Sequence, residues 1–546
     1  MKASAIARAG LRGLLYAMLM AAIALPFLTL AYLANTPAPG GGTATLSHYV
    51  ATVLPGYVRT SLVLATLAVS LAIVIGAACA WQIERYQFPG RDVLAWALML
   101  PLAMPAYVAA YVMADFTQFS GPLQSALRLA FGWSKGDYWF PEATSLPGAV
   151  VCFAFTLYPY VYLLARSAFA ERGHELQDAA RCLGMGRSRA WWSAVLPAAR
   201  PAIAAGGVLA LMEVLADYGA VSYLGVDTLS VGIFRAWYNM SDITSAAQLA
   251  LALLTVVIVV VYAERLLRSR ARYASTRARF VPRETVSGAP GIARTLLCML
   301  PVLLGFALPA LLLVRLHLQL DGATPWQEVL GWVGNSIQVG LWVAVVTLTL
   351  AVVLQTRQRL WRERAAAWMS RILGLGYAVP GAVLALGILI PLAAADNRLI
   401  DLIRSLSGAS PGLLLTGSIV ALVYAICVRF YGVAGNATAS AYSRIPASLD
   451  DCARVLGLSR TAIFRRVHWP LTRRAVLAAT LLVFIDTLKE LPATLALRPF
   501  DFNTLATATY TFARDERLAE AALPSLLIVL ASLPAVILLT RRTRDT

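Results

Sequence analysis

Long runs of apolar residues, separated by short polar segments, dominate this chain. Each run holds about 20 mostly apolar residues, the length that a helix needs to cross the hydrocarbon of a bilayer. Backbone groups inside lipid must find their hydrogen bonds within the segment, so the runs are interpreted as helices. They lie near residues 13–34, 60–81, 94–114, 147–166, 202–222 and 246–264, and again near 295–316, 336–354, 372–394, 412–428, 475–494 and 522–540. The pattern predicts an all-α polytopic membrane protein with about twelve transmembrane helices in two six-helix halves.

Basic residues mark one side of this arrangement. All but three of the 46 Lys and Arg residues are Arg, and most of them fall in alternate segments between the apolar runs, such as 166–189, 265–294, 357–371 and 429–474. Segments rich in Lys and Arg stay on the cytoplasmic side, so both termini are predicted to be cytoplasmic. The first apolar run is longer than the core of a cleaved signal peptide, which predicts a retained anchor.

Composition excludes several classes of protein. Apolar residues make up 59% of the 546 residues and charged residues only 14%, whereas soluble domains carry about 25% charged residues. The net charge of +18 lies between membrane runs rather than on a soluble face, so we expect the lipid bilayer and no nucleic acid as a partner. The six Cys and four His residues lack the spacing of metal ligands or of a disulfide framework.

The chain contains an internal repeat. Residues 176–200 (LQDAARCLGMGRSRAWWSAVLPAAR) and 449–473 (LDDCARVLGLSRTAIFRRVHWPLTR) are identical at nine of 25 positions, at a constant offset of 273. Upstream, Ser61/Ser336 and Pro105/Pro380 correspond at an offset of 275. We therefore interpret the chain as a tandem duplication, with a first six-span half at 1–264, an Arg-rich cytoplasmic linker at 265–294 and a second six-span half at 295–546.

Each copy of the repeated segment predicts a short helix, a turn, and a helix that leads into the membrane. A carboxylate at Asp178 or Asp451 suits the first turn of a helix, where it meets the positive end of the dipole. Gly184 and Gly457 suit a helix end that needs a left-handed residue. The small residues of the pairs Ala179–Ala180 and Cys452–Ala453 leave room for the surface of another protein.

These residues resemble the EAA motif of the membrane subunits of ATP-binding-cassette (ABC) importers. The resemblance implies the type I permease fold, a bacterial inner membrane location, a homodimeric cytoplasmic ABC ATPase and a periplasmic substrate-binding protein. It also implies that ATPase coupling falls to Asp178, Ala179, Ala180 and Gly184 in the first copy and to Asp451, Cys452, Ala453 and Gly457 in the second. This chain departs from the motif in carrying Asp for Glu in both copies, Cys452 for Ala, and Trp469 for Leu.

The fused, double-length form narrows the resemblance to a few groups of permease. Segments 216–240 and 486–525 are most similar to the ferric-iron group, and thiamine and phosphonate permeases are the alternatives. No Lys follows a Gly anywhere in the chain, so a phosphate-binding G-x-x-x-x-G-K-[ST] loop is absent. We therefore expect a transport subunit without an ATPase site or cofactor of its own, with ATP bound by the partner subunit.

Four carboxylates fall inside predicted membrane spans. Glu213 and Asp217 are spaced i, i+4 on the fifth span, and Asp486 and Glu490 repeat that spacing at the same offset of 273. Ionisable groups inside a membrane are costly and mark functional sites by default, so these residues are candidates to line a path for a hard cation. The alternative is that they reach water at the external ends of the helices and stabilise helix contacts.

Twelve spans in two halves also describe secondary transporters, which are driven by an ion gradient. That class leaves the repeated cytoplasmic motif unexplained and predicts uptake without any ATPase. A membrane-embedded enzyme would need a nucleophile–base constellation, and the sequence shows none.

Overall fold

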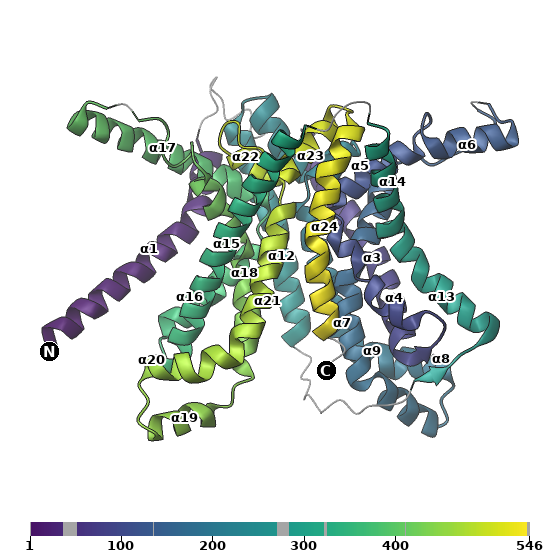
Figure 1. The fold of residues 1–546 in the computed structure, drawn as a ribbon, viewed down its shortest axis with the longest axis horizontal. Helices are drawn as coiled ribbons and strands as arrows, with labels where there is room; N and C mark the ends of the chain where they lie inside the picture. The colour runs from purple at the N-terminus through teal and green to yellow at the C-terminus, as the bar shows by residue number, and fades with distance from the viewer. Residues whose placement is uncertain are drawn as a thin grey trace. The chain divides into compact units, whose positions relative to one another are not determined.

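The computed structural model describes residues 2–36, 52–134, 136–269, 283–320, 325–409 and 411–542. Contacts divide the chain into two compact units. Unit 1 holds the described residues of 1–46, 233–254 and 324–507, and unit 2 holds those of 47–232, 255–323 and 508–546. Both units are built almost entirely of helices (Figure 1).

Unit 2 contains most of the first half of the sequence. Its elements are α3 (Leu54–Arg85), β1 (Tyr86–Gln87), α4 (Arg91–Ala97), the 3₁₀ turn η1 (Leu100–Ala103), α5 (Ala106–Thr117), α6 (Pro122–Phe131), α7 (Leu146–Cys182), α8 (Arg187–Ala190), the π-helical turn η2 (Trp191–Val195), α9 (Leu196–Ala216), α10 (Gly219–Tyr223), β2 (Glu284–Thr285), α13 (Gly288–Val302), the π-helical turn η4 (Leu303–Ala307), α14 (Leu308–Leu318) and α24 (Leu518–Arg542).

Unit 1 contains most of the second half. Its elements are α1 (Lys2–Ala34), α15 (Trp326–Leu360), α16 (Arg364–Gly374), the 3₁₀ turn η5 (Leu375–Ala378), α17 (Gly381–Ser407), α18 (Ile419–Ser443), α19 (Ala447–Val455), α20 (Arg460–Ile463), the π-helical turn η6 (Phe464–His468), α21 (Trp469–Lys489) and α22 (Pro492–Leu497). The chain passes from one unit to the other within α11 (Leu229–Phe234), α12 (Ile243–Ser269) and α23 (Leu505–Arg514), and the π-helical turn η3 (Arg235–Asn239) lies in unit 1.

The two units repeat the same local structure. In unit 2 the helices α3, α7 and α9 pack against one another, and in unit 1 their equivalents α15, α18 and α21 do so. The helix pair α8/α20, the π-helical turns η2/η6 and the helix pair α9/α21 correspond at an offset of 273, as the sequence repeat predicts. In both units a serine hydroxyl accepts a hydrogen bond from the first amide of a later helix. Ser61 accepts from Leu229 of α11, and Ser336 accepts from Leu505 of α23.

The first helix of each sequence half packs in the unit formed by the other half. In unit 1, α1 lies against α17, and in unit 2 the first span of the second half contacts α4 through α13 and α5 through α14. Pro26 inside α1 has no backbone N–H, which leaves the carbonyl of Ala22 without its helical donor. The hydroxyl of Tyr424 on α18 donates to this carbonyl, so a partner from the second half of the sequence completes the hydrogen bonding of α1. The packing units thus combine both halves of the sequence, and the boundaries at 264 and 295 stay a prediction about the repeat.

Long apolar helices account for the predicted spans. Within the described residues, nine helices are long and apolar enough to cross a membrane. The pair Arg91–Ala103 and Ala106–Phe131, bent by 93° at its break, is apolar enough to be a broken span or a re-entrant loop. The apolar run predicted at 94–114 is interrupted in the structure, because Pro105 precedes a new helix that begins at Ala106. The remaining two predicted spans correspond to α21 and to the apolar stretch Leu518–Pro534 of α24.

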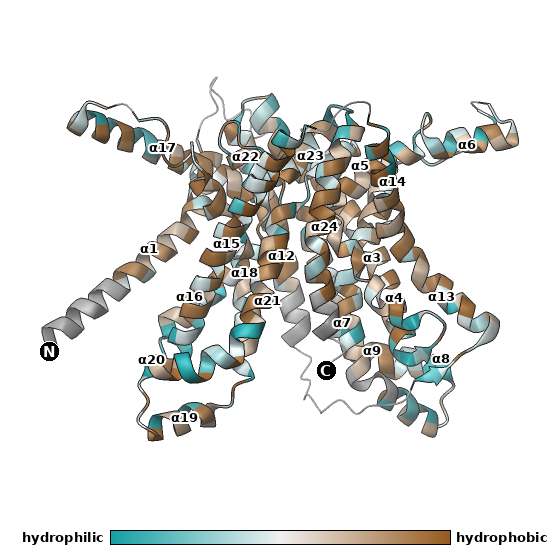
Figure 2. Cartoon of the chain, viewed as in Figure 1, coloured by the Kyte–Doolittle hydropathy of each residue, from teal (hydrophilic) through white to brown (hydrophobic). Residues whose placement is uncertain are grey.

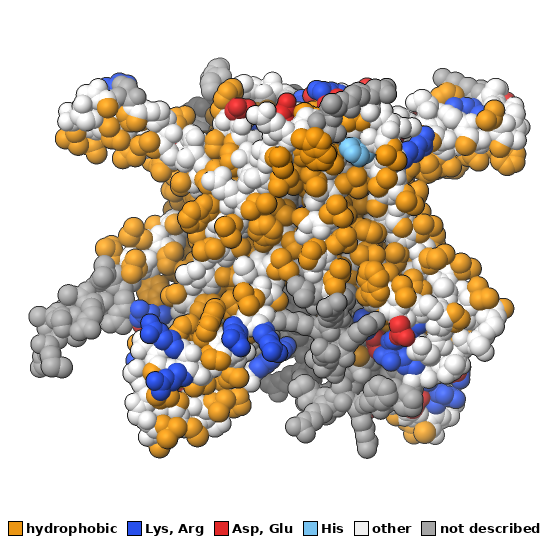
Figure 3. Space-filling view, viewed as in Figure 1, with side chains coloured by type: hydrophobic (Ala, Val, Ile, Leu, Met, Phe, Trp, Pro, Cys, Tyr) orange, Lys and Arg blue, Asp and Glu red, His pale blue; other side chains and the backbone are white. Residues whose placement is uncertain are grey.

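The surfaces of the long helices suit a lipid environment. Hydrophobic residues dominate these helices, and hydrophilic residues are frequent around α8 and α20 (Figure 2). Large apolar side chains stay exposed on their outer faces, including Ile258, Val259, Leu341 and Trp342. On the face in Figure 3, hydrophobic side chains cover the helices, and clusters of Lys and Arg lie toward the ends that carry α8 and α20. Residues 270–282 of the predicted linker lie outside the described residues, whereas 283–294 form β2 and the start of α13.

Candidate functional site

The first copy of the repeated motif forms the end of α7. This helix runs without a break from Leu146 to Cys182, so the predicted short motif helix is here the last turns of a membrane helix. Gly184 follows with φ of +83°, and its amide donates to the carbonyl of Arg181 at 2.9 Å. Asp178 is half exposed and lies 3.5 Å from the guanidinium of Arg85. The predicted left-handed glycine is confirmed.

The second copy forms a separate helix, α19. Pro446 disfavours helical backbone at the residue before it, and α18 accordingly ends at Ser443. Gly457 has φ of +75° and donates to the carbonyl of Arg454 at 2.9 Å, which repeats the geometry of the first copy. Asp451 and Cys452 are exposed, whereas Ala453 is buried against Leu360 and Ile463.

In both copies the motif presents an apolar tip. Ala179 is exposed and Ala180 is buried, so one of the two small residues faces outward and the other supports the packing. Leu183 and its equivalent Leu456 are 80% and 79% exposed. A leucine displayed in this way on two equivalent loops is a surface suited to contact with another protein.

A buried ionic cluster, which the sequence analysis did not identify, holds α19 in place. Asp450 accepts hydrogen bonds from Arg359 Nε at 2.8 Å and pairs with His468 Nε2 at 2.6 Å, while Arg359 also donates to the carbonyls of Tyr442 and Ile445. Burial raises the pKa of Asp450, but the bonds from His468 and Arg359 outweigh that effect and leave the pKa below its usual value. The only signal in the sequence is a second Asp beside Asp451, and His468 has no recognisable spacing from it.

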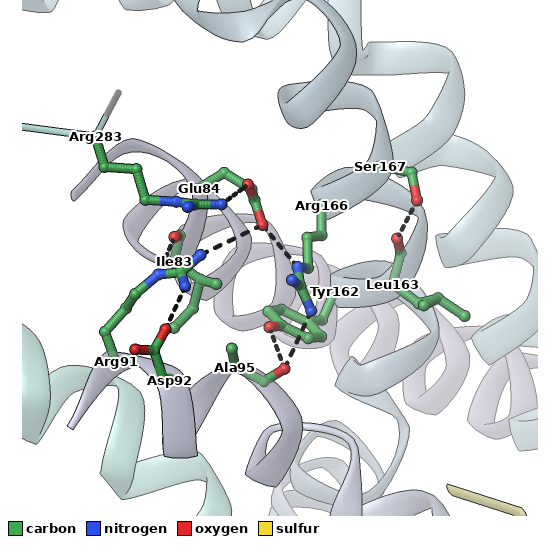
Figure 4. A network of polar contacts seen from close by, with 10 residues as sticks. All are labelled: Ile83, Glu84, Arg91, Asp92, Ala95, Tyr162, Leu163, Arg166, Ser167 and Arg283. Atoms are coloured by element: carbon green, nitrogen blue, oxygen red, sulfur yellow. Dashed lines mark hydrogen bonds and ion pairs between the residues drawn. The ribbon is translucent and has the colours of Figure 1, made fainter. Parts of the chain in front are cut away.

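The first repeat carries its own ionic cluster, built around a buried carboxylate at the end of α3, shown in Figure 4. Glu84, near the end of α3, accepts from Arg166 of α7 at 2.7 Å and from Arg283 at 3.1 Å, and Arg91 of α4 approaches to 3.9 Å (Figure 4). Glu84 corresponds to Arg359 at the upstream offset of 275. The two repeats therefore carry opposite charges at this equivalent position, but Glu84 pairs with α7 and Arg283 whereas Arg359 pairs with α19.

The intramembrane carboxylates lie at the helix ends rather than along one helix face. Helix α9 ends at Ala216 and α21 ends at Lys489, so Asp217 and Glu490 are both the first residue beyond their helix, with extended backbone. The predicted i, i+4 placement on one face is wrong for both pairs. The helices end there because each carboxylate caps the short helix that follows, and such capping competes with continued helix.

Asp217 and Glu490 perform the same local task. Asp217 accepts from the amides of Ala220 and Val221 in α10, at 2.8 and 3.3 Å. Glu490 accepts from the amides of Ala493 and Thr494 and from the hydroxyl of Thr494, at 3.0, 2.9 and 2.8 Å. These bonds fix the chain reversal after each helix.

The second repeat adds a counter-ion to this cap. Arg429 of α18 lies 3.1 Å from Glu490, and the two side chains are only 9% and 1% exposed. The equivalent of Arg429 in the first repeat is Thr156, whose hydroxyl bonds to the backbone of its own helix. Glu213 and Asp486 are half-buried, one turn before the ends of α9 and α21.

A candidate metal centre does not emerge from the described residues, where no group of three or more His, Cys, Asp or Glu side chains is placed to hold a metal ion. The candidate sites are thus the two motif loops and the carboxylates at the ends of α9 and α21.

Comparisons with known proteins agree with the duplication. The family described as binding-protein-dependent transport system inner membrane component matches residues 72–273 and again residues 348–543. An Fe(3+)-transport system permease protein of Haemophilus influenzae is 25% identical over 478 residues, which are 86% of this chain and 86% of that protein.

Shorter relatives match part of the chain. A sulfate transport system permease protein of Salmonella typhimurium is 28% identical over 36% of this chain and 70% of its own length. A molybdenum transport system permease protein of Escherichia coli is 34% identical over 30% of this chain and 68% of its own length.

Proposed function

Because the chain belongs to the family of binding-protein-dependent transport system inner membrane components and is an ABC importer permease, we propose that it conducts ferric iron across the bacterial inner membrane. A periplasmic binding protein delivers the ion, and a homodimeric cytoplasmic ATPase supplies the energy. The observation that carries the choice of ferric iron is the length of the match. The Fe(3+) relative aligns with 86% of this chain, whereas the sulfate and molybdenum relatives align with 36% and 30% of it.

In this proposal the two motif loops each dock one ATPase subunit. The exposed Leu183 and Leu456, beside the left-handed Gly184 and Gly457, support it, because two equivalent apolar tips fit two copies of one partner. Both loops, and with them both termini, then lie on the cytoplasmic side.

The first experiment identifies cargo and energy source. The chain is purified from its native host with its associated proteins, reconstituted in liposomes with the binding protein, and supplied with ⁵⁵Fe(III) citrate, sulfate or molybdate. We expect ATP-dependent uptake of iron alone. Uptake of sulfate or molybdate instead would overturn the choice of cargo, and uptake driven by an ion gradient without an ATPase would overturn the mechanism.

The intramembrane carboxylates are proposed to line the path of the ion. Oxygen ligands suit hard cations, and Glu213 and Asp486 occupy equivalent half-buried positions in the two repeats. Asp217 and Glu490 stand at the following turns, where they also cap α10 and α22.

A double variant tests the path. The double variant Glu213→Ala/Asp486→Ala is expected to lower iron uptake at least about tenfold, because the ion in the path loses about 1.4 kcal/mol or more of stabilisation by the two carboxylates. The ATPase should still co-purify with the variant. Asp227→Asn, at an exposed position beyond α10, is the matched control and should transport normally. Unchanged uptake in the double variant would remove these residues from the path.

A further inference from the structure

The segment immediately before α13 is bound to the end of α3. We call residues 283–286 the strap. Its strand β2 pairs in parallel with β1, with Tyr86 opposite Glu284, and the amide of Val286 donates to the carbonyl of Gln87 at 2.8 Å. Helix α13 adds to this contact, because the hydroxyl of Thr295 donates to the carbonyl of Pro89 at 2.7 Å.

Charged side chains fix the strap at one end to the ionic cluster of the first repeat. Arg283 points at the buried carboxylate of Glu84, which it shares with Arg166 (Figure 4). The Glu84 side chain is only 6% exposed, so it depends on these guanidinium groups to offset the cost of its burial. Arg283 thus ties the strap to both α3 and α7.

The neighbouring residue of the strap reaches the motif loop itself. Glu284 accepts from Arg187, the first residue of α8, at 2.9 Å. It also lies 3.8 Å from Arg85, whose guanidinium is 3.5 Å from Asp178 of the motif. One carboxylate of the strap therefore bridges both sides of the turn that contains Gly184.

Among the described residues, the second repeat fastens its motif loop without such a segment. There the buried Asp450 and His468 and the half-buried Arg359 join α19 to α15 and to η6. At the positions equivalent to Asp450 and His468 the first repeat has Gln177 and Val195, which cannot form that cluster.

From this difference we propose that Arg283 and Glu284 are positioning residues, and that the strap holds the first motif loop in the geometry that receives the ATPase. The inference rests on the proposed function for the identity of that partner. It assigns the end of the linker a role in coupling, in place of the passive tether between halves that the sequence suggests. It also makes the first motif loop and α13 move as one body.

Amide hydrogen exchange on the full-length chain tests the strap without any partner. In Glu284→Gln we expect the amides of 176–190 to exchange about two- to fivefold faster, because a partly exposed ion pair is lost, while those of 447–463 stay unchanged. Arg187→Gln should give the same increase, and the double variant should add little to either single change. Thr285→Ala, exposed on the same strand, is the matched control.

The outcomes separate the strap from the proposed function. Unchanged exchange at 176–190 in Glu284→Gln, or an equal increase in both motif loops, would overturn the strap. In the presence of the co-purified ATPase, the Glu284→Gln chain should bind it about two- to fivefold more weakly, and unaltered binding would also overturn the strap. If the unmodified chain retains no ATPase at all, the proposed function fails, and the exchange measurement still decides whether the strap holds the loop.

Discussion

The buried pair of Arg429 and Glu490 offers the sharpest test of the energetics of this fold. The perturbation is Arg429→Met, which keeps the length of the side chain and removes its charge. At 3.1 Å and an effective dielectric constant of about 20, the attraction between the two groups is roughly 5 kcal/mol. Three hydrogen bonds to Glu490 remain in the variant and retain part of that stabilisation. We therefore expect the free energy of unfolding to fall by about 3–5 kcal/mol.

The assay is unfolding in mixed micelles with an increasing fraction of SDS, followed by tryptophan fluorescence. Because the residues form a pair, Arg429→Met with Glu490→Gln should lose about 2–3 kcal/mol less than the sum of the single losses. Thr156→Val, at the equivalent position of the first repeat, is the matched control and should lose less than about 1 kcal/mol. A loss below about 1 kcal/mol in Arg429→Met, or strict additivity in the double variant, would refute the reasoning.

Three further predictions concern local features of unit 1. The pKa of Asp450 is lowered in the folded state, because its bonds to His468 and Arg359 outweigh burial. The carboxylate therefore contributes its full stabilisation of the fold above the ordinary pKa of about 3.9, and this stabilisation is lost as the pH falls through the lowered pKa. Amide protection factors of 447–455 should fall on acidification, and Asp450→Asn should abolish that pH dependence. An equal fall in the variant would show that a group other than Asp450 causes it. Gly457→Ala should lower the free energy of unfolding by about 1–2 kcal/mol, because its φ of +75° strains a residue that has a side chain while no neighbouring atom obstructs the added Cβ. Gly457→Asn should lower it less, and equal losses would contradict a backbone origin. Tyr424→Phe leaves the carbonyl of Ala22 unpaired and should cost about 1–3 kcal/mol in the same SDS assay, whereas no loss would show that the bond contributes nothing.

Hydropathy and the repeat anticipated much of the fold. The apolar runs located the membrane helices because a spanning helix must be apolar over most of its length, whatever it packs against. The turn geometry at Gly184 and Gly457 was equally accessible, since only a residue without a side chain adopts a positive φ at little cost.

The ends of α9 and α21 could not be read from the same signal. Apolar residues continue on both sides of Asp217 and Glu490, so nothing in the hydropathy marks a break. The helices end because these carboxylates bond to amides three and four residues ahead, and the same atoms that suggested an ion path also form a cap.

Contacts between distant parts of the sequence escaped prediction for a different reason. The bond between Asp450 and His468 joins α19 to the turn that begins α21, and the packing of α1 on α17 joins residues more than 350 positions apart. Local periodicity carries no information about which helices become neighbours, so a single sequence leaves these contacts open.

The placement of α1 has a consequence for how the chain is made. Helix α1 is synthesised before α17, and its apolar window is only 11% buried inside the protein. Its neighbour α17 begins at Gly381, so at about 5–20 residues per second the ribosome needs roughly 20–70 s to reach it. Throughout that interval the carbonyl of Ala22 lacks its donor, because Tyr424 has not yet been synthesised. A gene cut between the two halves would yield two polypeptides, each of which would need the first helix of the other to complete its packing unit. In the fused chain the covalent link keeps these partners together, whereas separate subunits would have to meet by diffusion.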